Sequence, residues 1–196
     1  PTPHLSAKEL PAVTKAVSAP VLAGLAKDGL EYRGMLYIGV MLTAAGPKVL
    51  EFNCRFGDPE TQAVLPLLDE DLLTLCEQTA KGALPATAPK WHGAAVTVVL
   101  ASEGYPASPV SGKPITGLAA ATALPGVLVF HAGTVRDGEI WKTNGGRVLG
   151  VTGVGKDAAE ARKRAYGAAE AIDFDGVQYR RDIGLPRRSD ATPATP

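Results

Sequence analysis

The sequence lacks an excess of charge of either sign, since its 20 lysine and arginine residues match its 20 aspartate and glutamate residues. This balance argues against nucleic acid as a partner, because binding to a polyanion normally needs a basic surface. No apolar stretch approaches the roughly 20 residues needed to span a bilayer. Residues 1–10 also lack the basic start and apolar run of a signal peptide. We therefore expect a cytoplasmic protein with no membrane partner.

Cysteine is also scarce. Cys54 and Cys76 lie far apart and lack metal-ligand spacing, which predicts two reduced thiols rather than a disulfide framework or a zinc site. Apolar residues, by contrast, are plentiful: they make up 45% of the 196 residues. That is enough for one large domain or two small ones with a real core.

The first part of the chain begins with a predicted helix over residues 6–27. Ser6 and Glu9 have the spacing of a capping box, and apolar residues then recur at helical spacing. Asp28-Gly29 ends the pattern. Two strand-like runs flank a turn and predict an antiparallel β-hairpin, and a second helix follows. These three elements are expected over residues 34–43, 48–56 and 67–81.

The second part alternates β-branched runs with turn signals. Asp137-Gly138 is a turn signal between two of the runs, and Asp157 can cap a helix over residues 157–172. Strands are expected over residues 94–101, 127–132, 139–143 and 147–152, after a loop over 104–117. The pattern predicts an α+β fold, with domains over residues 1–84 and 93–186 and a disordered tail over 187–196.

The segment from Val49 to Glu60 carries the strongest chemical signal. On a strand, Glu51, Asn53 and Arg55 share one face while apolar residues occupy the other, where they can pack on a core. Carboxylate and amide oxygens suit Mg²⁺, and a guanidinium suits phosphate. The alternative is a solvent-exposed strand with a charge pair. The turn at 57–60, which adds two carboxylates, favours a site.

This row resembles the last metal-binding strand of ATP-grasp ligases, which activate a carboxylate as an acyl phosphate. The longer string from Glu51 to Gln62, Glu-Phe-Asn-Cys-Arg-Phe-Gly-Asp-Pro-Glu-Thr-Gln, resembles the version in the phosphoribosylamine–glycine ligase family. The resemblance extends from about Glu31 to Gly184. It is also carried by residues 34–39, 130–134, 143–149, 162–166 and 181–184. It implies the last part of an ATP-grasp lobe, formed by a helix, an antiparallel β-hairpin and a helix, followed by a small mixed β/α carboxy-terminal domain.

The family resemblance implies a reaction and a set of roles. Glycine is joined to 5-phosphoribosylamine with ATP as co-substrate, through an acyl phosphate, giving glycinamide ribonucleotide, ADP and phosphate in purine biosynthesis. Glu51 and Asn53 would hold Mg²⁺, or Mn²⁺ in its place, beside ATP. Arg55 would bind nucleotide and stabilise the transferring phosphoryl group.

Other residues are candidates for acceptor binding. Asp58 is expected to position an amine, although Asp-Pro-Glu is also good helix-start chemistry. His131 is a candidate pocket residue, with a hydrogen-bonded structural role as the alternative. The remaining candidates form a loop whose glycine amides can face an anion, or alternatively an Asn-Gly hairpin turn. They are Thr143, Asn144, Gly145, Gly146 and Arg147.

The resemblance also implies that an amino-terminal domain and most of the nucleotide-binding lobe precede Pro1. That missing amino-terminal half is an expected partner, and the isolated chain is expected to be inactive. Two other functions remain open from the residues alone. One is a different ATP-grasp carboxylate–amine ligase or a purine carboxylase, and the other is a non-catalytic docking module.

Overall fold

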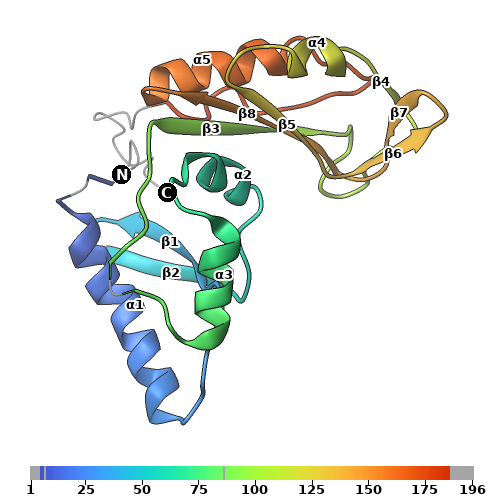
Figure 1. The fold of residues 1–196 in the computed structure, drawn as a ribbon. Coiled ribbons are helices and arrows are strands. Elements are labelled where there is room, and N and C mark those ends of the chain that lie inside the picture. The colour runs from blue at the N-terminus through green and yellow to red at the C-terminus, as the bar shows by residue number, and fades with distance from the viewer. Residues whose placement is uncertain (1–4, 7, 86, 186–196) are drawn as a thin grey trace. The chain divides into compact units, whose positions relative to one another are not determined.

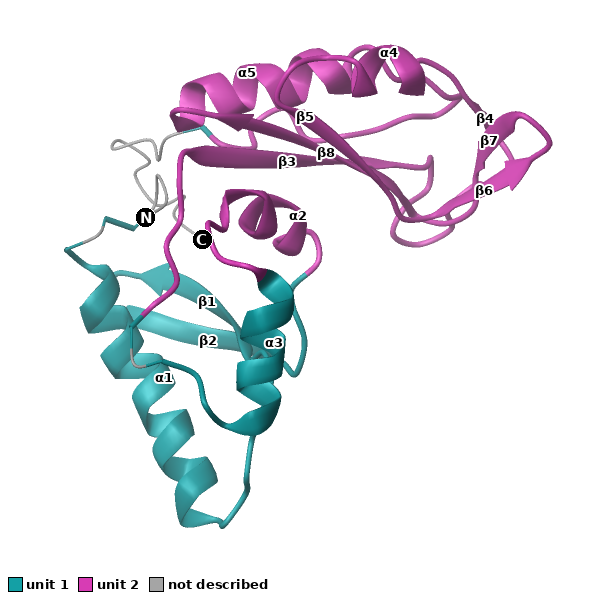
Figure 2. Cartoon of the chain, in the orientation of Figure 1, with its two compact units in different colours: residues 1–57, 72–87, 185–196 teal, residues 58–71, 88–184 magenta. Residues whose placement is uncertain are grey.

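The computed structural model describes residues 5–6, 8–85 and 87–185 (Figure 1). These residues divide into two compact units (Figure 2). The first contains the described residues up to Gly57, residues 72–87 and Leu185, and the second contains residues 58–71 and 88–184. The predicted domains differ from this division mainly over residues 58–71, which belong to the second unit. The predicted tail, 187–196, lies outside the described residues.

The first unit begins with helix α1, Leu10–Lys27. The Ser6 amide donates to the Glu9 carboxylate (2.9 Å), and the Glu9 amide lies 3.3 Å from the Ser6 hydroxyl. This reciprocal pair has the hydrogen bonds of the predicted capping box, but the helix begins four residues later than predicted, with Glu9 as its N-cap residue. The helix ends at Asp28, and Gly29 follows with a φ of 68°, a value that favours glycine.

A two-stranded antiparallel hairpin follows, as predicted, formed by β1, Tyr37–Thr43, and β2, Gly46–Asn53. Strand β2 ends three residues earlier than expected. The reason is its partner: Asn53 pairs with Tyr37, the first residue of β1, so Cys54 to Phe56 have no strand to pair with. In this unit β2 packs against α1.

The predicted helix over residues 67–81 is shorter, since α3 spans only Leu72–Lys81. Its expected first turn is hydrogen-bonded to Lys90 instead. The Asp69 amide donates to the Lys90 carbonyl (3.1 Å), and the Glu70 carboxylate accepts from the Lys90 amide (2.9 Å). Two short helices precede this segment within the second unit, α2, Thr61–Val64, and the 3₁₀ helix η1, Leu65–Leu67.

The core of the second unit is a three-stranded antiparallel sheet of order β3-β8-β5. Its strands are β3, Ala94–Ala101, β8, Arg147–Gly155, and β5, Val127–His131. Helix α5, Ala158–Ala169, covers one face (Figure 1), and Asp157 caps it as predicted by accepting from the Glu160 amide (2.8 Å). The close approach needs glycine, because a Cβ on Gly153 would lie 2.2 Å from the Ala161 carbonyl oxygen. The fully buried side chains here include Val98, Leu100, Leu149, Val151, Ala161 and Ala165.

A second small sheet has the order β4-β7-β6. The sequence predicts that residues 127–132 and 139–143 are joined by the Asp137-Gly138 turn. Instead, this turn joins β6, Thr134–Asp137, to β7, Ile140–Thr143, and β5 pairs with β8. The predicted loop over 104–117 contains β4, Pro114–Ile115, which is followed by helix α4, Leu118–Thr122. These elements were missed because they are only two to five residues long, and β4 also pairs with a strand that is distant in the sequence, β7.

Candidate functional site

Glu51 and Asn53 lie on the same face of β2. Their partners in the hairpin are Gly39 and Tyr37, which are likewise two residues apart. The residue opposite Glu51 is a glycine for a steric reason: a Cβ on Gly39 would lie 3.0 Å from the Glu51 Cγ. The absence of a side chain on Gly39 therefore leaves room for the Glu51 carboxylate arm to cross the hairpin.

The structure differs from two other expectations for this segment. Arg55 lies beyond the end of β2, so strand alternation does not align it with Glu51 and Asn53, and its Nη1 donates to the Phe56 carbonyl (2.7 Å). The apolar face was expected to pack on a core. Instead, Leu50 and Phe52 are 64% and 49% exposed.

The pair on β2 has the right chemistry for part of a hard-cation site. A carboxylate and an amide oxygen on one strand face are ligands that Mg²⁺ accepts, and this ion usually keeps several water or phosphate oxygens. Within the described residues, no group of three or more His, Cys, Asp or Glu side chains gathers that could hold a metal. Glu51 and Asn53 could supply only part of such a coordination shell, with water or phosphate oxygens as the remaining ligands.

Arg147 reaches its position through a β-bulge. Leu149 pairs with Leu100, and Arg147 pairs with Ala101, so Val148 is an extra residue on β8. Regular alternation would have placed Arg147 on the face of Leu149, towards α5. The bulge places it with Ala101 on the opposite face, which is the re-aiming effect typical of bulges beside sites.

Asp58 contacts Arg147 at two points. The Asp58 Oδ2 lies 3.2 Å from the Arg147 Nη2, and the Arg147 Nη1 donates to the Asp58 carbonyl (2.9 Å). The other carboxylate oxygen accepts from the Gln62 Nε2 (3.1 Å). The side chains of Asp58 and Arg147 are 46% and 41% exposed, so the pair lies at the surface of its unit. Asp58 is not the cap of α2, whose N-cap residue is Glu60.

The Gly145-Gly146 segment presents free amides. Ser102 ties down both carbonyls, since its hydroxyl donates to the Gly145 oxygen (2.8 Å) and its amide to the Gly146 oxygen (2.9 Å). Neither glycine amide has a hydrogen-bond partner within the described residues. Tyr105 packs directly on this segment: a Cβ on Gly146 would lie 2.1 Å from its Cδ2. Two neighbouring N–H groups without partners, in a loop whose carbonyls are fixed by other residues, are a common way to bind an anion.

The other loop candidates have structural contacts. Thr143 is 1% exposed, and its hydroxyl accepts from the Lys113 amide (3.1 Å). The Asn144 amide donates to the Gly133 carbonyl (2.8 Å), which fixes the backbone of the loop. These contacts brace the residues that follow them.

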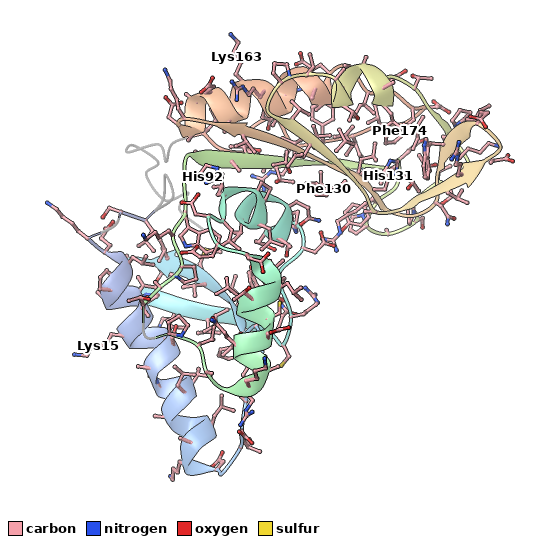
Figure 3. All side chains as sticks on the ribbon, in the orientation of Figure 1. Lys15, His92, Phe130, His131, Lys163 and Phe174 are labelled. Carbon is pink, nitrogen blue, oxygen red and sulfur yellow. The ribbon has the colours of Figure 1, made fainter. Side chains whose placement is uncertain are left out.

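His131 lies at the end of β5 (Figure 3) and pairs with Leu149, whereas Arg147 pairs with Ala101. Its Nδ1 lies 2.9 Å from the Thr134 hydroxyl, and its ring centroid lies 4.2 Å from that of Trp141. The structure brings His131 into an aromatic contact with Trp141, and no hydrogen bond or ion pair joins its side chain to Arg147 within the described residues.

A pocket of about 440 Å³ opens beside Arg147 in the second unit. Val99 and Ala101 of β3 line it, together with the rings of Tyr105 and Tyr179. We call it the Arg147 pocket. Sequence reasoning did not single out Tyr105 or Gln62. Gln62 stood at the end of the recognised string, but Tyr105 lies in a proline-rich loop without a motif.

Comparison with known families matches two domains. Residues 1–61 match the ATP-grasp (A) domain of phosphoribosylglycinamide synthetase, and residues 95–186 match its C domain. The chain belongs to this family. The match confirms the resemblance found in the sequence, and the ATP-grasp relatives described below confirm the α+β fold class. Within the described residues, no helix of this family member has the length and apolar character to cross a membrane.

Its relatives are much longer than the chain. A phosphoribosylamine–glycine ligase of Synechocystis is 50% identical over 191 residues, covering 94% of this chain and 44% of that protein. A trifunctional purine biosynthetic protein of Gallus gallus is 49% identical over 187 residues, covering 94% of this chain and 18% of that protein. This family member therefore spans less than half the length of these relatives.

Solved structures agree on the fold. The crystal structure of phosphoribosylamine–glycine ligase from Thermotoga maritima has a TM-score of 0.71 and 41% identity, covering 82% of this chain and 39% of that chain. The biotin carboxylase domain of 2-oxoglutarate carboxylase from Hydrogenobacter thermophilus, solved with magnesium ADP and bicarbonate, has a TM-score of 0.63. At 15% identity over 91% of this chain and 39% of that one, this second likeness shows the fold alone.

Proposed function

We propose that this chain forms part of an ATP-dependent ligase that joins glycine to 5-phosphoribosylamine. The observation that carries the proposal is the Glu51–Asn53 pair on one face of β2, within a segment that matches the family's ATP-grasp domain. Relatives at 45–50% identity that bear the name phosphoribosylamine–glycine ligase support the choice of substrates.

The reaction balances without a covalent enzyme intermediate. A glycine carboxylate oxygen attacks the γ-phosphorus of ATP and ADP leaves, which gives glycyl phosphate. The amine of phosphoribosylamine then attacks the acyl carbon and phosphate leaves. Charge neutralisation and alignment supply most of the rate in such reactions.

On the nucleotide side, Glu51 and Asn53 would hold a divalent cation, Mg²⁺ or Mn²⁺. When bound, this cation would neutralise charge on the phosphate oxygens of ATP. Arg55 would contribute a second positive charge, provided that its guanidinium leaves the Phe56 carbonyl to which it now donates. The proposed roles of Glu51 and Asn53 have the stronger geometric support, because these residues share a strand face.

On the acceptor side, Arg147 and the amides of Gly145 and Gly146 would receive an anionic group of phosphoribosylamine. Their support is geometric: Arg147 lines the Arg147 pocket, and the two amides have no partner within the described residues. Asp58 would hold Arg147, since its carboxylate and its carbonyl both contact the guanidinium. Thr143 and Asn144 would brace the loop.

The test uses a ligase that contains this chain together with the remaining length that the relatives carry. Glu51→Ala should lower kcat by at least about 100-fold, because charge stabilisation by a bound cation is worth several kcal/mol. The measurement is ADP release that depends on both glycine and phosphoribosylamine. Thermal unfolding should be unchanged, because Glu51 is exposed.

Glu139→Ala is the matched control, since this glutamate lies at the β6–β7 turn with its side chain 94% exposed. It should retain wild-type turnover. Wild-type activity in Glu51→Ala would overturn the assignment of the metal strand. ADP release that requires a different carboxylate or amine would instead indicate another ATP-grasp ligase or a carboxylase.

A further inference from the structure

We propose that Gln62 is a positioning residue, which holds the Arg147 guanidinium in place through the carboxylate of Asp58. Its kinetic consequence rests on the proposed function, because it concerns the binding of the phosphorylated amine. The contact chain itself is independent of that function. It joins Asp58 and Gln62, which lie four residues apart in the sequence, to the distant Arg147, and all three belong to the second unit.

Gln62 is anchored against the centre of the sheet. It belongs to the short helix α2, and its Cγ lies 3.9 Å from the position that a Cβ on Gly150 would occupy. Gly150 pairs with Val99 and Phe130 in the middle of the β3-β8-β5 sheet. The Gln62 arm therefore lies against β8 at this point and reaches Asp58, to which its Nε2 donates.

The charge of Asp58 decides the orientation of the Gln62 amide. The Nε2 donates to the Asp58 Oδ1 (3.1 Å), while the Oε1 is buried with no partner within the described residues. The reverse orientation would aim an amide oxygen at a carboxylate oxygen, with no proton between them. A buried acceptor without a partner costs free energy, so leucine would serve better if packing were the only need at this position.

The contacts divide the Asp58 carboxylate between two partners. Gln62 holds Oδ1, and Arg147 contacts Oδ2 and also donates to the Asp58 carbonyl. With Oδ1 held, the carboxylate cannot rotate freely, and the guanidinium stays at the wall of the Arg147 pocket. A preorganised cation binds an anion more tightly than a mobile one, because less side-chain freedom is lost on binding.

The first test is Gln62→Leu in the ligase that carries the remaining length of the relatives. The KM for phosphoribosylamine should rise about tenfold, with kcat and the KM values for ATP and glycine changed less than about twofold, because binding geometry alone is lost. Gln78→Leu is the matched control, since Gln78 is a half-buried glutamine of α3. It should leave all constants unchanged. An unchanged KM for phosphoribosylamine in Gln62→Leu would overturn the proposal.

A double-mutant cycle separates positioning from general damage to the fold. In an Arg147→Ala background, Gln62→Leu should change the same KM by less than about twofold, because its effect runs through Arg147. A further tenfold rise in that background would contradict the proposed route.

Gln62→Glu adds a second measurement, the pH dependence of the KM for phosphoribosylamine, which a purely structural role would not change. This variant also tests the proposal if Gln62→Leu does not fold. A protonated glutamic acid can still donate to the Asp58 Oδ1, whereas its carboxylate cannot. The ratio of variant to wild-type KM should therefore be near one at low pH and rise as the pH increases. A ratio that does not depend on pH would overturn the proposal.

A measurement that does not require enzyme activity distinguishes failure of the positioning role from failure of the proposed function. In ¹⁵N NMR spectra, rotation of the Arg147 guanidinium should be slow in the wild type and faster in Gln62→Leu. If the wild-type ligase forms no product, the proposed function fails while this comparison still decides the positioning role. Equal rotation rates would overturn the positioning role whatever the activity.

Discussion

At the scale of single residues, the structure explains why small side chains stand beside the candidate groups. Gly39 leaves room for Glu51, and Gly146 for the ring of Tyr105. The sequence indicated the chemistry of Glu51 and Asn53, because alternation along a strand is a local property. It could not indicate the glycines' role, because each makes room for a side chain from another segment.

The packing of Tyr105 on Gly146 leads to a stability prediction. Gly146→Ala would place a Cβ 2.1 Å from the Tyr105 Cδ2, so the ring or the loop must shift. We expect the free energy of unfolding to fall by about 1–3 kcal/mol, as in other overpacked sites. Urea denaturation of the chain measures this change.

Gly167→Ala is the matched control for this substitution. Gly167 lies within α5, and a Cβ there would meet no atom within 4 Å. The free energy of unfolding should rise by about 0.5–1 kcal/mol, because alanine favours the helix over glycine. Equal changes in the two variants would contradict the packing described for Tyr105.

At the scale of elements, the sequence pattern correctly predicted features that depend only on neighbouring residues. Strand β3, the Asp157 cap and the Ser6–Glu9 capping box all agree with the sequence. The end of β2 and the bulge at Val148 do not follow from local pattern. Both depend on pairing with another strand, and the bulge moves Arg147 to the face on which Asp58 contacts it.

The cap of α5 leads to a prediction at this scale. Asp157→Ala should lower the free energy of unfolding by about 1 kcal/mol, because the Glu160 amide loses its acceptor. Asp173→Ala is the control, since this exposed aspartate has no side-chain partner within the described residues. Chemical denaturation of the two variants should show a loss in the first only, and a similar loss in both would count against the cap.

At the scale of the whole molecule, family membership came from ordered motifs rather than from composition. The balanced charge and apolar content fit many proteins, whereas the string from Glu51 to Gln62 pointed to one family that the domain matches then confirmed. The contacts among Asp58, Gln62 and Arg147 lie within one compact unit. The chain spans less than half the length of its ligase relatives, so the reaction must be tested in a protein that has their full length.

The most direct test of the central claim follows oxygen from glycine. In the proposed reaction a glycine carboxylate oxygen attacks ATP and remains on the phosphate when the amine displaces it. With glycine labelled with ¹⁸O in its carboxylate, the full-length ligase should release phosphate that carries one labelled oxygen per turnover, only when phosphoribosylamine is present. Unlabelled phosphate, or phosphate released equally without glycine, would contradict ligation through an acyl phosphate.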